Sequence, residues 1–228
     1  MFSKATTEIR ETLYGVMART IQGSQTAHSI GSGVMIAPNY VVSNAHLTHL
    51  SSDISKDNHK EIEVIRSPEI GKNCIRACLV KEDIVRDLAL LKIEGPSSSK
   101  CASLMDTVVP SGTNCGSLGF PLSTAQVING ALVYALNERF QGAFISSYFT
   151  ESISDRAIPW YEVDRVMYGG SSGCPFFLEN GQVVGLQARV RTDLSGGGSA
   201  QDKRNFLAIS LLIPSPEIIK FAKSCGVI

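Results

Sequence analysis

Apolar and β-branched residues along this chain gather in short runs. Segments rich in glycine, proline, serine and asparagine separate these runs. Many short strands with regular turn signals favour an all-β fold built of barrels over a helical or a parallel-sheet fold. The predicted strands are residues 33–37, 40–43, 61–66, 74–81, 88–93, 114–118, 126–136, 143–150, 174–178, 183–189 and 205–212.

The N-terminal segment has a different pattern. Its apolar residues Ile9, Leu13, Val16 and Met17 recur at the spacing of one face of an α-helix. We therefore predict an N-terminal helix within residues 1–20. Such a helix would either pack on the barrels or offer a surface for a partner protein or for self-association.

A short C-terminal helix is expected over residues 215–225. Ser215 suits the cap of this helix, Pro216 its first turn and Glu217 the positive end of its dipole. The glycine-rich segment 191–204 is expected to be a mobile loop rather than part of a strand.

The composition excludes several classes of function. Lysine plus arginine number 21, as do aspartate plus glutamate, so no charged field attracts nucleic acid. No apolar run reaches the roughly 20 residues of a membrane helix. The N-terminal segment also lacks the apolar stretch of a secretory signal. We therefore expect a soluble cytoplasmic protein that acts neither on nucleic acid nor at a membrane.

Three short segments carry the residue types of nucleophilic catalysis. His46 closes an apolar strand, Asp87 precedes the apolar run Leu-Ala-Leu-Leu-Lys-Ile, and Ser172 lies in the turn Gly-Ser-Ser-Gly-Cys-Pro. A serine hydroxyl is a weak nucleophile until a base takes its proton, and a carboxylate can orient that base. We predict Ser172 as the nucleophile, His46 as the general base and Asp87 as the group that orients it.

Isolated residues of these types are more often structural than catalytic, and other histidines and an aspartate compete for these roles. His28, His49 and His59 stand in no comparable context, and we assign them no catalytic role. Asp83 is the nearby competitor of Asp87, but the apolar run that follows Asp87 favours the latter.

The chain order His, Asp, Ser is that of chymotrypsin-like proteases and differs from the orders in subtilisins and α/β-hydrolases. With these motifs the chain resembles the trypsin/chymotrypsin superfamily, and most closely its HtrA/Deg branch. That branch has blocks similar to residues 31–37 and 87–93, and an aspartate like Asp164 eight residues before the serine. The resemblance extends from about Gly31 to Pro214.

The resemblance implies a chymotrypsin-like, all-β fold of two packed six-stranded antiparallel β-barrels, forming a single protease domain over residues 1–228. The first lobe would span about 25–100 and the second about 105–214, with the catalytic residues at their seam. The segment Gly-Pro-Ser-Ser-Ser-Lys at 95–100 is the best candidate for the connection. The strand count alone does not imply two barrels.

The resemblance also implies an oxyanion hole made by the backbone amides of Gly170 and Ser172. The family pattern Gly-x-Ser-Gly-x-Pro usually has glycine where this chain has Cys174, whose side chain we expect to be buried beneath the turn. Ser171 stands where extracellular trypsin-like enzymes carry an aspartate that pairs with a newly cut N-terminus. That zymogen switch is missing, so the enzyme is either always active or controlled by loop ordering.

The specificity pocket is predicted from Val166, Gln187, Ala188, Arg189 and Asn205. Val166 stands six residues before the nucleophile, where trypsin has an acid, so cleavage after lysine or arginine is not expected. The pocket suits small or aliphatic side chains. An alternative stays open, in which Arg189 charges the rim and the pocket prefers acids.

The six cysteines are expected to be free thiols. None directly follows His46, where secreted trypsin-like enzymes have a bridged cysteine, and none precedes Cys74. Cys74 and Cys78 are spaced like a zinc-ligand pair, but no second pair exists at the right spacing, so we expect no metal and no cofactor. Reduced thiols favour a reducing compartment.

The leading hypothesis is thus a serine endopeptidase that acts on protein or peptide substrates. A binding module or pseudoprotease that keeps the fold is the alternative, and a non-peptide esterase using the same site is a third. The intact set of three residues disfavours the pseudoprotease. The chain leaves no room for the PDZ domain common in HtrA proteins, so recruitment would use the N-terminal helix, the loops or another polypeptide.

Overall fold

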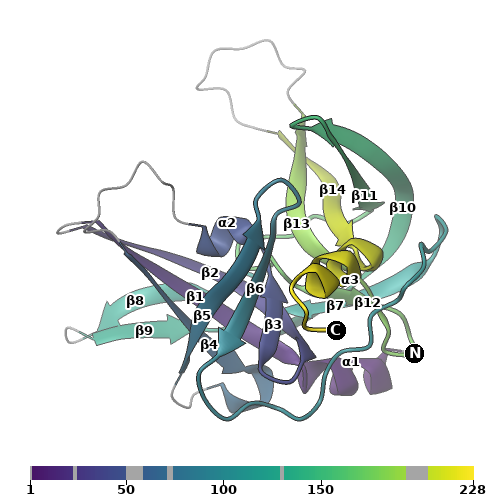
Figure 1. The fold of residues 1–228 in the computed structure, drawn as a ribbon. Helices are drawn as coiled ribbons and strands as arrows, with labels where there is room; N and C mark the ends of the chain where they lie inside the picture. The colour runs from purple at the N-terminus through teal and green to yellow at the C-terminus, as the bar shows by residue number, and fades with distance from the viewer. Residues whose placement is uncertain (1, 23–24, 50–58, 71–73, 129–130, 194–204) are drawn as a thin grey trace, which may run out of the picture.

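Two closed six-stranded antiparallel barrels lie side by side in the computed structural model, which describes residues 2–22, 25–49, 59–70, 74–128, 131–193 and 205–228 (Figure 1). The predicted fold class is confirmed. The first barrel has the strand order β1-β2-β3-β6-β5-β4. Its strands are β1 (Leu13–Gln22), β2 (Gln25–Ala37), β3 (Tyr40–Ser43), β4 (His59–Arg66), β5 (Ile75–Asp83) and β6 (Leu88–Ile93).

The second barrel has the order β10-β11-β14-β13-β12-β7. Its strands are β7 (Asn114–Gly119), β10 (Arg139–Ile153), β11 (Arg156–Val163), β12 (Pro175–Phe177), β13 (Val183–Asp193) and β14 (Asn205–Pro214). Strands β8 (Thr124–Ile128) and β9 (Ala131–Ala135) form a separate two-stranded sheet. The helical elements are α1 (Ser3–Arg10), α2 (Ala45–Thr48), the 3₁₀ turn η1 (Ser67–Glu69) and α3 (Ser215–Ser224).

Each barrel closes around its own apolar interior, and a further cluster fills the seam between them. Side chains along a strand alternate between its two faces. A barrel strand whose outer face is covered as well as its inner face therefore carries apolar residues on both faces. The seam cluster combines Val34, Val42 and Leu90 of the first barrel with Trp160 and Leu186 of the second. Helix α3 packs on this seam cluster through its own apolar residues. The barrels are therefore joined by a hydrophobic core.

The predicted N-terminal helix over 1–20 is wrong in its second half. Helix α1 ends at Arg10, and β1 begins at Leu13, pairing with both β2 and β4. Every residue from Thr12 to Ala18 is buried, so both faces of this strand carry apolar groups. When both faces are apolar, the alternation of apolar and polar residues that marks a strand is lost. The apolar spacing that remains resembles that of a helix. Ile9 alone of the four predicted helix-face residues lies in a helix.

Two strands also differ from the prediction. The single strand expected over 126–136 is the hairpin of β8 and β9. Strand β11 was not predicted, because it contains Pro159, and proline cannot donate a hydrogen bond to a neighbouring strand. In the structure Pro159 lies opposite Thr150 of β10, whereas β11 pairs with β14 only from Tyr161 onward. Pro159 is therefore tolerated where β11 has one neighbour.

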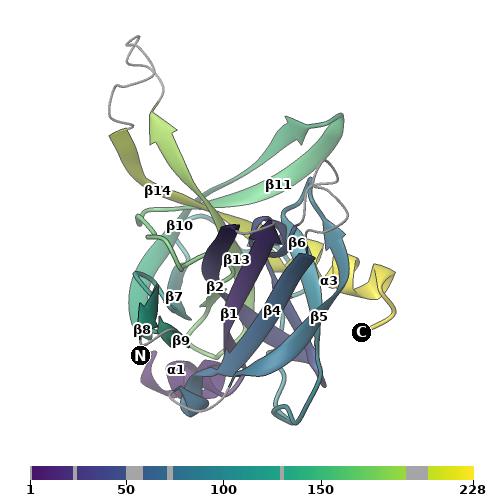
Figure 2. The ribbon, with the colours of Figure 1, turned by 90° about the vertical axis from the view of Figure 1, so that its left-hand side faces the viewer.

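The C-terminal helix is present, but its predicted cap is not. Helix α3 makes no side-chain cap bond at its N-terminus, and the Ser215 hydroxyl instead donates to the Met105 carbonyl at 2.6 Å. The predicted loop 191–204 begins later than expected, because β13 continues to Asp193, and residues 194–204 lie outside the described residues. Seen from the side, β10, β11, β13 and β14 extend beyond the barrel wall (Figure 2).

Candidate active site

Asp87, His46 and Ser172 form one hydrogen-bonded chain at the seam of the barrels. Asp87 Oδ2 lies 2.8 Å from His46 Nδ1, and His46 Nε2 lies 2.9 Å from Ser172 Oγ. The first barrel supplies the base and the acid, since His46 lies in α2 and Asp87 directly precedes β6. The second barrel supplies Ser172, in the turn before β12. The structure brings together the three residues that the sequence motifs singled out.

Asp87 is held in place by more than its bond to the imidazole. Its Oδ1 accepts from the His46 backbone N–H at 2.8 Å, and its carbonyl accepts from the Asn44 side-chain amide at 3.0 Å and from the Ala45 N–H at 3.2 Å. The backbone of Asp87 has a φ of +60°, a region in which aspartate and asparagine are enriched among non-glycine residues. Only 6% of Asp87 is exposed. Both carboxylate oxygens are thereby aimed at one residue, His46.

The competing residues are occupied elsewhere. His49 Nδ1 lies 2.7 Å from Glu82 Oε1, and the His28 ring stands edge-on to Tyr134. The side chain of His59 lies outside the described residues.

The carboxylate of Asp83 lies in a cluster of arginines. Burial raises the pKa of this carboxyl, but hydrogen bonds from Arg156 and Arg86 outweigh burial and lower the pKa to about 2. Asp83 therefore has two cationic partners of its own, and Asp87 is the acid that reaches the imidazole.

The turn that carries the nucleophile depends on two glycines. Gly170 has a φ of +90° and Gly173 a φ of +80°, values that L side chains rarely adopt. A Cβ atom on Gly170 would lie 2.3 Å from the Phe120 carbonyl oxygen, and one on Gly173 would lie 1.9 Å from the Ser32 carbonyl oxygen. Both positions thus need glycine for conformation and for space.

The peptide planes around Ser172 leave two amides directed away from the protein. The Gly169 carbonyl accepts from Leu122 N–H at 2.7 Å, and the Ser171 carbonyl accepts from Cys174 N–H at 2.9 Å. Across a trans peptide the carbonyl and the following N–H point in opposite directions. The N–H groups of Gly170 and Ser172 therefore point the other way, and within the described part of the chain neither donates to a protein acceptor. These are the two predicted oxyanion donors.

Ser32 of β2 connects this turn to the first barrel. Its N–H donates to the Ser172 carbonyl at 2.7 Å, and its hydroxyl lies 3.2 Å from the Gly170 carbonyl. The thiol of Cys174 lies 3.2 Å from the same hydroxyl. Cys174 is fully buried, as expected for a side chain beneath the turn, and burial raises its pKa to about 11. The thiol therefore stays protonated and packs as a small apolar group.

A cavity of about 420 Å³ opens beside Ser172. One wall is the segment before the nucleophile, with Val166, Met167, Tyr168 and Gly169, and the other is β13, with Gln187, Ala188 and Val190. No carboxylate lines this cavity within the described residues. Val166, Gln187 and Ala188 are among the pocket residues predicted from the sequence, whereas Met167, Tyr168 and Val190 are not. The strand alternation of β13 could have indicated Val190.

Two of the predicted pocket residues, Arg189 and Asn205, are not among the described residues that line the cavity. Arg189 is absent from the cavity lining, because its guanidinium lies 4.8 Å from the centre of the Trp160 ring, on the other face of β13. Asn205 begins β14, and its side chain lies outside the described residues. The alternative of an arginine at the pocket rim that selects acids before the cleaved bond is therefore not supported.

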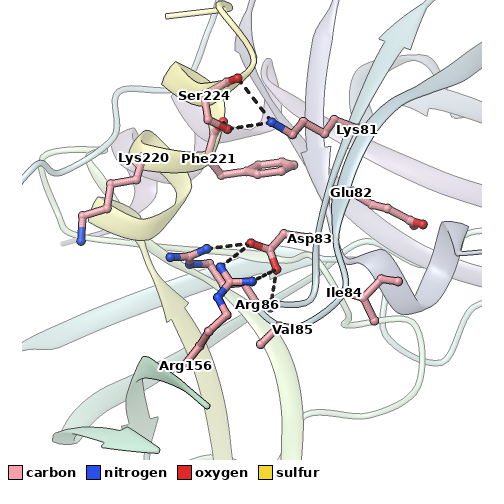
Figure 3. A pocket seen from close by; sticks show the side chains of 10 residues that line it. All are labelled: Lys81, Glu82, Asp83, Ile84, Val85, Arg86, Arg156, Lys220, Phe221 and Ser224. Atoms are coloured by element: carbon pink, nitrogen blue, oxygen red, sulfur yellow. Dashed lines mark hydrogen bonds and ion pairs between the residues drawn. The ribbon is translucent and has the colours of Figure 1, made fainter. Parts of the chain in front are cut away.

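A larger cavity, of about 570 Å³, lies apart from the catalytic residues, between the turn after β5 and helix α3 (Figure 3). Its cations already have partners. Arg156 and Arg86 both bind Asp83, and Lys81 donates to Ser224. Arg86 also reaches Glu217 of α3 at 2.9 Å. This ion-pair cluster links β5 of the first barrel to β11 and α3, just before the turn that ends in Asp87.

The six cysteines form no disulfide, and the described residues contain no group of three or more potential metal ligands among His, Cys, Asp and Glu. No helix in the described ranges is both long enough and apolar enough to cross a membrane.

Comparisons with known proteins agree with this fold. The trypsin-like peptidase domain family matches residues 31–186. A protein named probable periplasmic serine endoprotease DegP-like, from Ectopseudomonas mendocina, is 26% identical over 200 residues, which cover 87% of this chain and 35% of the relative. One of the same name from a Marinomonas species is 27% identical over 203 residues, covering 89% of this chain and 36% of the relative. The chain thus spans about a third of the length of these curated relatives.

Solved structures share the fold at low sequence identity. The Rv3671c protease of M. tuberculosis in its active form has a TM-score of 0.67 and 19% identity, covering 98% of this chain and 85% of the other. An HtrA-type protease with a tripeptide has a TM-score of 0.70 and 19% identity, covering 98% of this chain and 63% of the other. The chain therefore belongs to the trypsin-like peptidase domain family.

Proposed function

We propose that this chain is a serine endopeptidase that hydrolyses peptide bonds through an acyl-enzyme on Ser172. The observation that carries the proposal is the chain of bonds from Asp87 through His46 to Ser172, at 2.8 and 2.9 Å. Such distances are those at which a base takes the proton of a nucleophile and a third group orients the base.

The chemistry follows from these contacts. As Ser172 Oγ attacks the carbonyl carbon of the substrate, its proton moves to His46 Nε2, and Asp87 stabilises the resulting imidazolium. The carbonyl oxygen gains negative charge and accepts hydrogen bonds from the N–H groups of Gly170 and Ser172, each worth about 3 kcal/mol in the transition state. His46 then gives the proton to the leaving amine, and the peptide bond breaks. A water molecule attacks the ester in the same way and releases Ser172.

We propose small or aliphatic residues before the cleaved bond. The support is the chemistry of the 420 Å³ cavity, whose walls carry Val166, Met167, Ala188 and Val190 and no carboxylate. A lysine or arginine there would bury a charge without a partner, at a cost of several kcal/mol. An aliphatic side chain loses only its water and gains dispersion contacts.

A fluorophosphonate probe tests the proposal directly, because it reacts with an activated serine and needs no known substrate. The wild-type protein should be labelled on Ser172 and should cleave a casein-type substrate. Ser172→Ala should lose both, whereas Ser146→Ala, which removes an exposed serine of β10, should keep both. Labelling that persists in Ser172→Ala would contradict the assignment of the nucleophile.

The same experiment separates the two other candidate functions. A protease-fold binding module would show neither labelling nor turnover, although its fold is intact. A non-peptide esterase would be labelled on Ser172 and hydrolyse esters but no peptide. The geometry disfavours the binding module, because the base, the acid and both oxyanion donors are present together.

We also propose a reducing location, such as the cytoplasm, on the ground of the six unpaired cysteines. The relatives carry the word periplasmic in their names, so this location differs from theirs. Thiol counting on protein taken directly from its source under denaturing conditions should give six. Two or fewer would contradict the proposal.

A further inference from the structure

Arg189 and its surroundings suggest a second specificity site, on the face of β13 opposite the cavity. Val190 lines the cavity beside Ser172, and the neighbouring Arg189 lies on the other face, over Trp160. Arg191 follows on the same face as Arg189, with its guanidinium 5.5 Å from the centre of the Phe149 ring. Phe149 and Trp160 are directly opposite each other on β10 and β11. The face thus consists of two aromatic rings with two arginines above them.

The edge of β13 next to this face has room for another strand. Strand β12 pairs with β13 only as far as Leu186, opposite Pro175. Gln187 then bonds to Gly173 and Cys174 in the nucleophile turn. Beyond Gln187, the paired neighbour of β13 within the described residues is β14 alone. An extended peptide can add to such an edge through main-chain hydrogen bonds.

An added strand fixes where its side chains go. Successive side chains of an extended chain point to opposite faces, and side chains directly across a strand pair share a face. If the residue before the cleaved bond enters the cavity beside Ser172, the residue second before the bond points to the face of Arg189. Arg189 is therefore the charged group that meets this second residue.

Arg189 is available for a new partner. Its side chain is 41% exposed, and the carboxylate that it meets among the described residues, that of Glu151, is 4.0 Å away and 49% exposed. Arg191 is more firmly paired, since Glu162 lies 2.9 Å from its guanidinium. The Trp160 ring beneath Arg189 is buried, and the guanidinium lies 4.8 Å from its centre, a distance at which the ring attracts the cation while the guanidinium keeps N–H donors for a carboxylate.

We propose that Arg189 selects substrates with an acidic residue, glutamate or aspartate, second before the cleaved bond. The carboxylate would take the place that Glu151 now occupies loosely. This inference rests on the proposed function and adds a substrate class to it. It also assigns the acid preference to a different substrate position from the one considered in the sequence analysis.

The test uses two internally quenched peptides that differ only in glutamate or glutamine second before a valine at the cut. For a partly exposed ion pair, we expect the wild type to favour the glutamate peptide by about three- to fivefold in kcat/KM. Arg189→Gln should bring this ratio close to one, and Arg189→Lys should keep part of it. Glu151→Gln should raise the ratio, because it removes the competing carboxylate. High salt should lower it.

Arg76→Gln is the matched control. Arg76 of β5 also lies 4.0 Å from a glutamate, Glu94, but at the end of β5 remote from Asp87. The Arg76→Gln variant should favour the glutamate peptide over the glutamine peptide by the same ratio of kcat/KM as the wild type. A wild-type ratio of one or less, or a ratio unchanged in Arg189→Gln, would overturn the inference.

A binding measurement separates this inference from the proposed function. Ser172→Ala should bind the glutamate peptide about three- to fivefold more tightly than the glutamine peptide. If the wild type cleaves neither peptide and the binding preference remains, the proposed function fails and the role of Arg189 stands. If both peptides are cleaved with equal efficiency, the role of Arg189 fails and the endopeptidase stands.

Discussion

The two halves of the site are held in different ways. The half from the first barrel is tied within itself: Asp87 bonds to the side chain and backbone of His46, and to Asn44 and Ala45. The half from the second barrel is tied both to its own barrel and to the first. The turn before β12 is held by Ser32 of β2, by Leu122 after β7 and by Gln187 of β13. The base and its acid are thus assembled inside one barrel, whereas the nucleophile and the oxyanion donors depend on packing between segments.

Because of this difference, substitutions in the two halves should have different effects on activity. A change within the His46–Asp87 half acts on proton transfer at one point. A change around the Ser172 turn acts on the nucleophile, the oxyanion donors and the cavity together, since one short segment carries all three.

The largest expected effect comes from the residues that join the halves. Ser172→Ala or His46→Ala should lower peptidase kcat/KM by roughly 10³-fold or more, and Asp87→Asn by less. The double variant of Ser172 and His46 should be scarcely worse than either single one, because these groups act as a unit. Turnover near that of the wild type in Ser172→Ala would rule out this mechanism.

A smaller loss is expected when the second half is distorted and the first is left alone. Gly170→Ala places a Cβ 2.3 Å from the Phe120 carbonyl at a φ of +90°, so the oxyanion amide must move. We expect kcat to fall about 10²- to 10³-fold, as when one oxyanion donor is lost. Gly142→Ala, whose Cβ would meet nothing within 4 Å, serves as the control. Equal activity in both variants would show that the turn is not critical.

A change to the cavity beside Ser172 should alter which substrates are cleaved and leave the His46–Asp87 pair intact. The wild-type protein should cut after small or aliphatic residues in a peptide library. Val166→Asp adds a carboxylate to the cavity wall and should raise cleavage after lysine or arginine by about tenfold relative to valine, equal to about 1.4 kcal/mol. A wild-type profile dominated by lysine or arginine would contradict the pocket assignment, though not the catalytic residues.

The smallest effect concerns the ion-pair cluster that joins the barrels behind Asp87. The pKa of Asp83 is about 2 in the folded protein, below its ordinary value of 3.8, so its ion pairs stabilise the fold above pH 3.8. This stabilisation disappears as the pH falls through about 2. Asp83→Asn should therefore lower the free energy of unfolding by about 1 kcal/mol near neutral pH, allowing for solvent screening.

Urea unfolding of both proteins between pH 2 and pH 7 checks this expectation. The two curves should converge toward pH 2, and activity at neutral pH should change little. A difference that persists unchanged at pH 2 would point to lost packing rather than to a lost charge.

The short motifs singled out three candidate catalytic residues because each of them is marked by its own neighbours in the sequence. His46 at a strand end, Asp87 before an apolar run and Ser172 between glycines are adjacent in sequence to the features that mark them. The strands Tyr40–Ser43 and Leu88–Ile93 were predicted to the residue for a similar reason, since turn-forming residues bound them on both sides.

The errors have a common physical cause. Strand β1 was taken for helix because apolar groups cover both of its faces, and that covering comes from distant segments: β2, β4 and the connection after β9. Strand β11 was missed because the tolerance of Pro159 depends on which neighbours β11 has. Arg189 was assigned to the cavity because a register shift between Gln187 and Arg189 changes which side chains face it.

The sequence by itself predicted the candidate chemistry of this protein: a nucleophile, a base, an acid, the glycines of the turn and an apolar pocket wall at Val166. These depend on residue types and on spacings of a few positions. Only the tertiary structure decided how the barrels close, which amides are free beside Ser172 and which face of β13 Arg189 occupies. Those features arise from pairings between segments far apart in the chain, and their register is set by the packing of both barrels rather than by any local pattern.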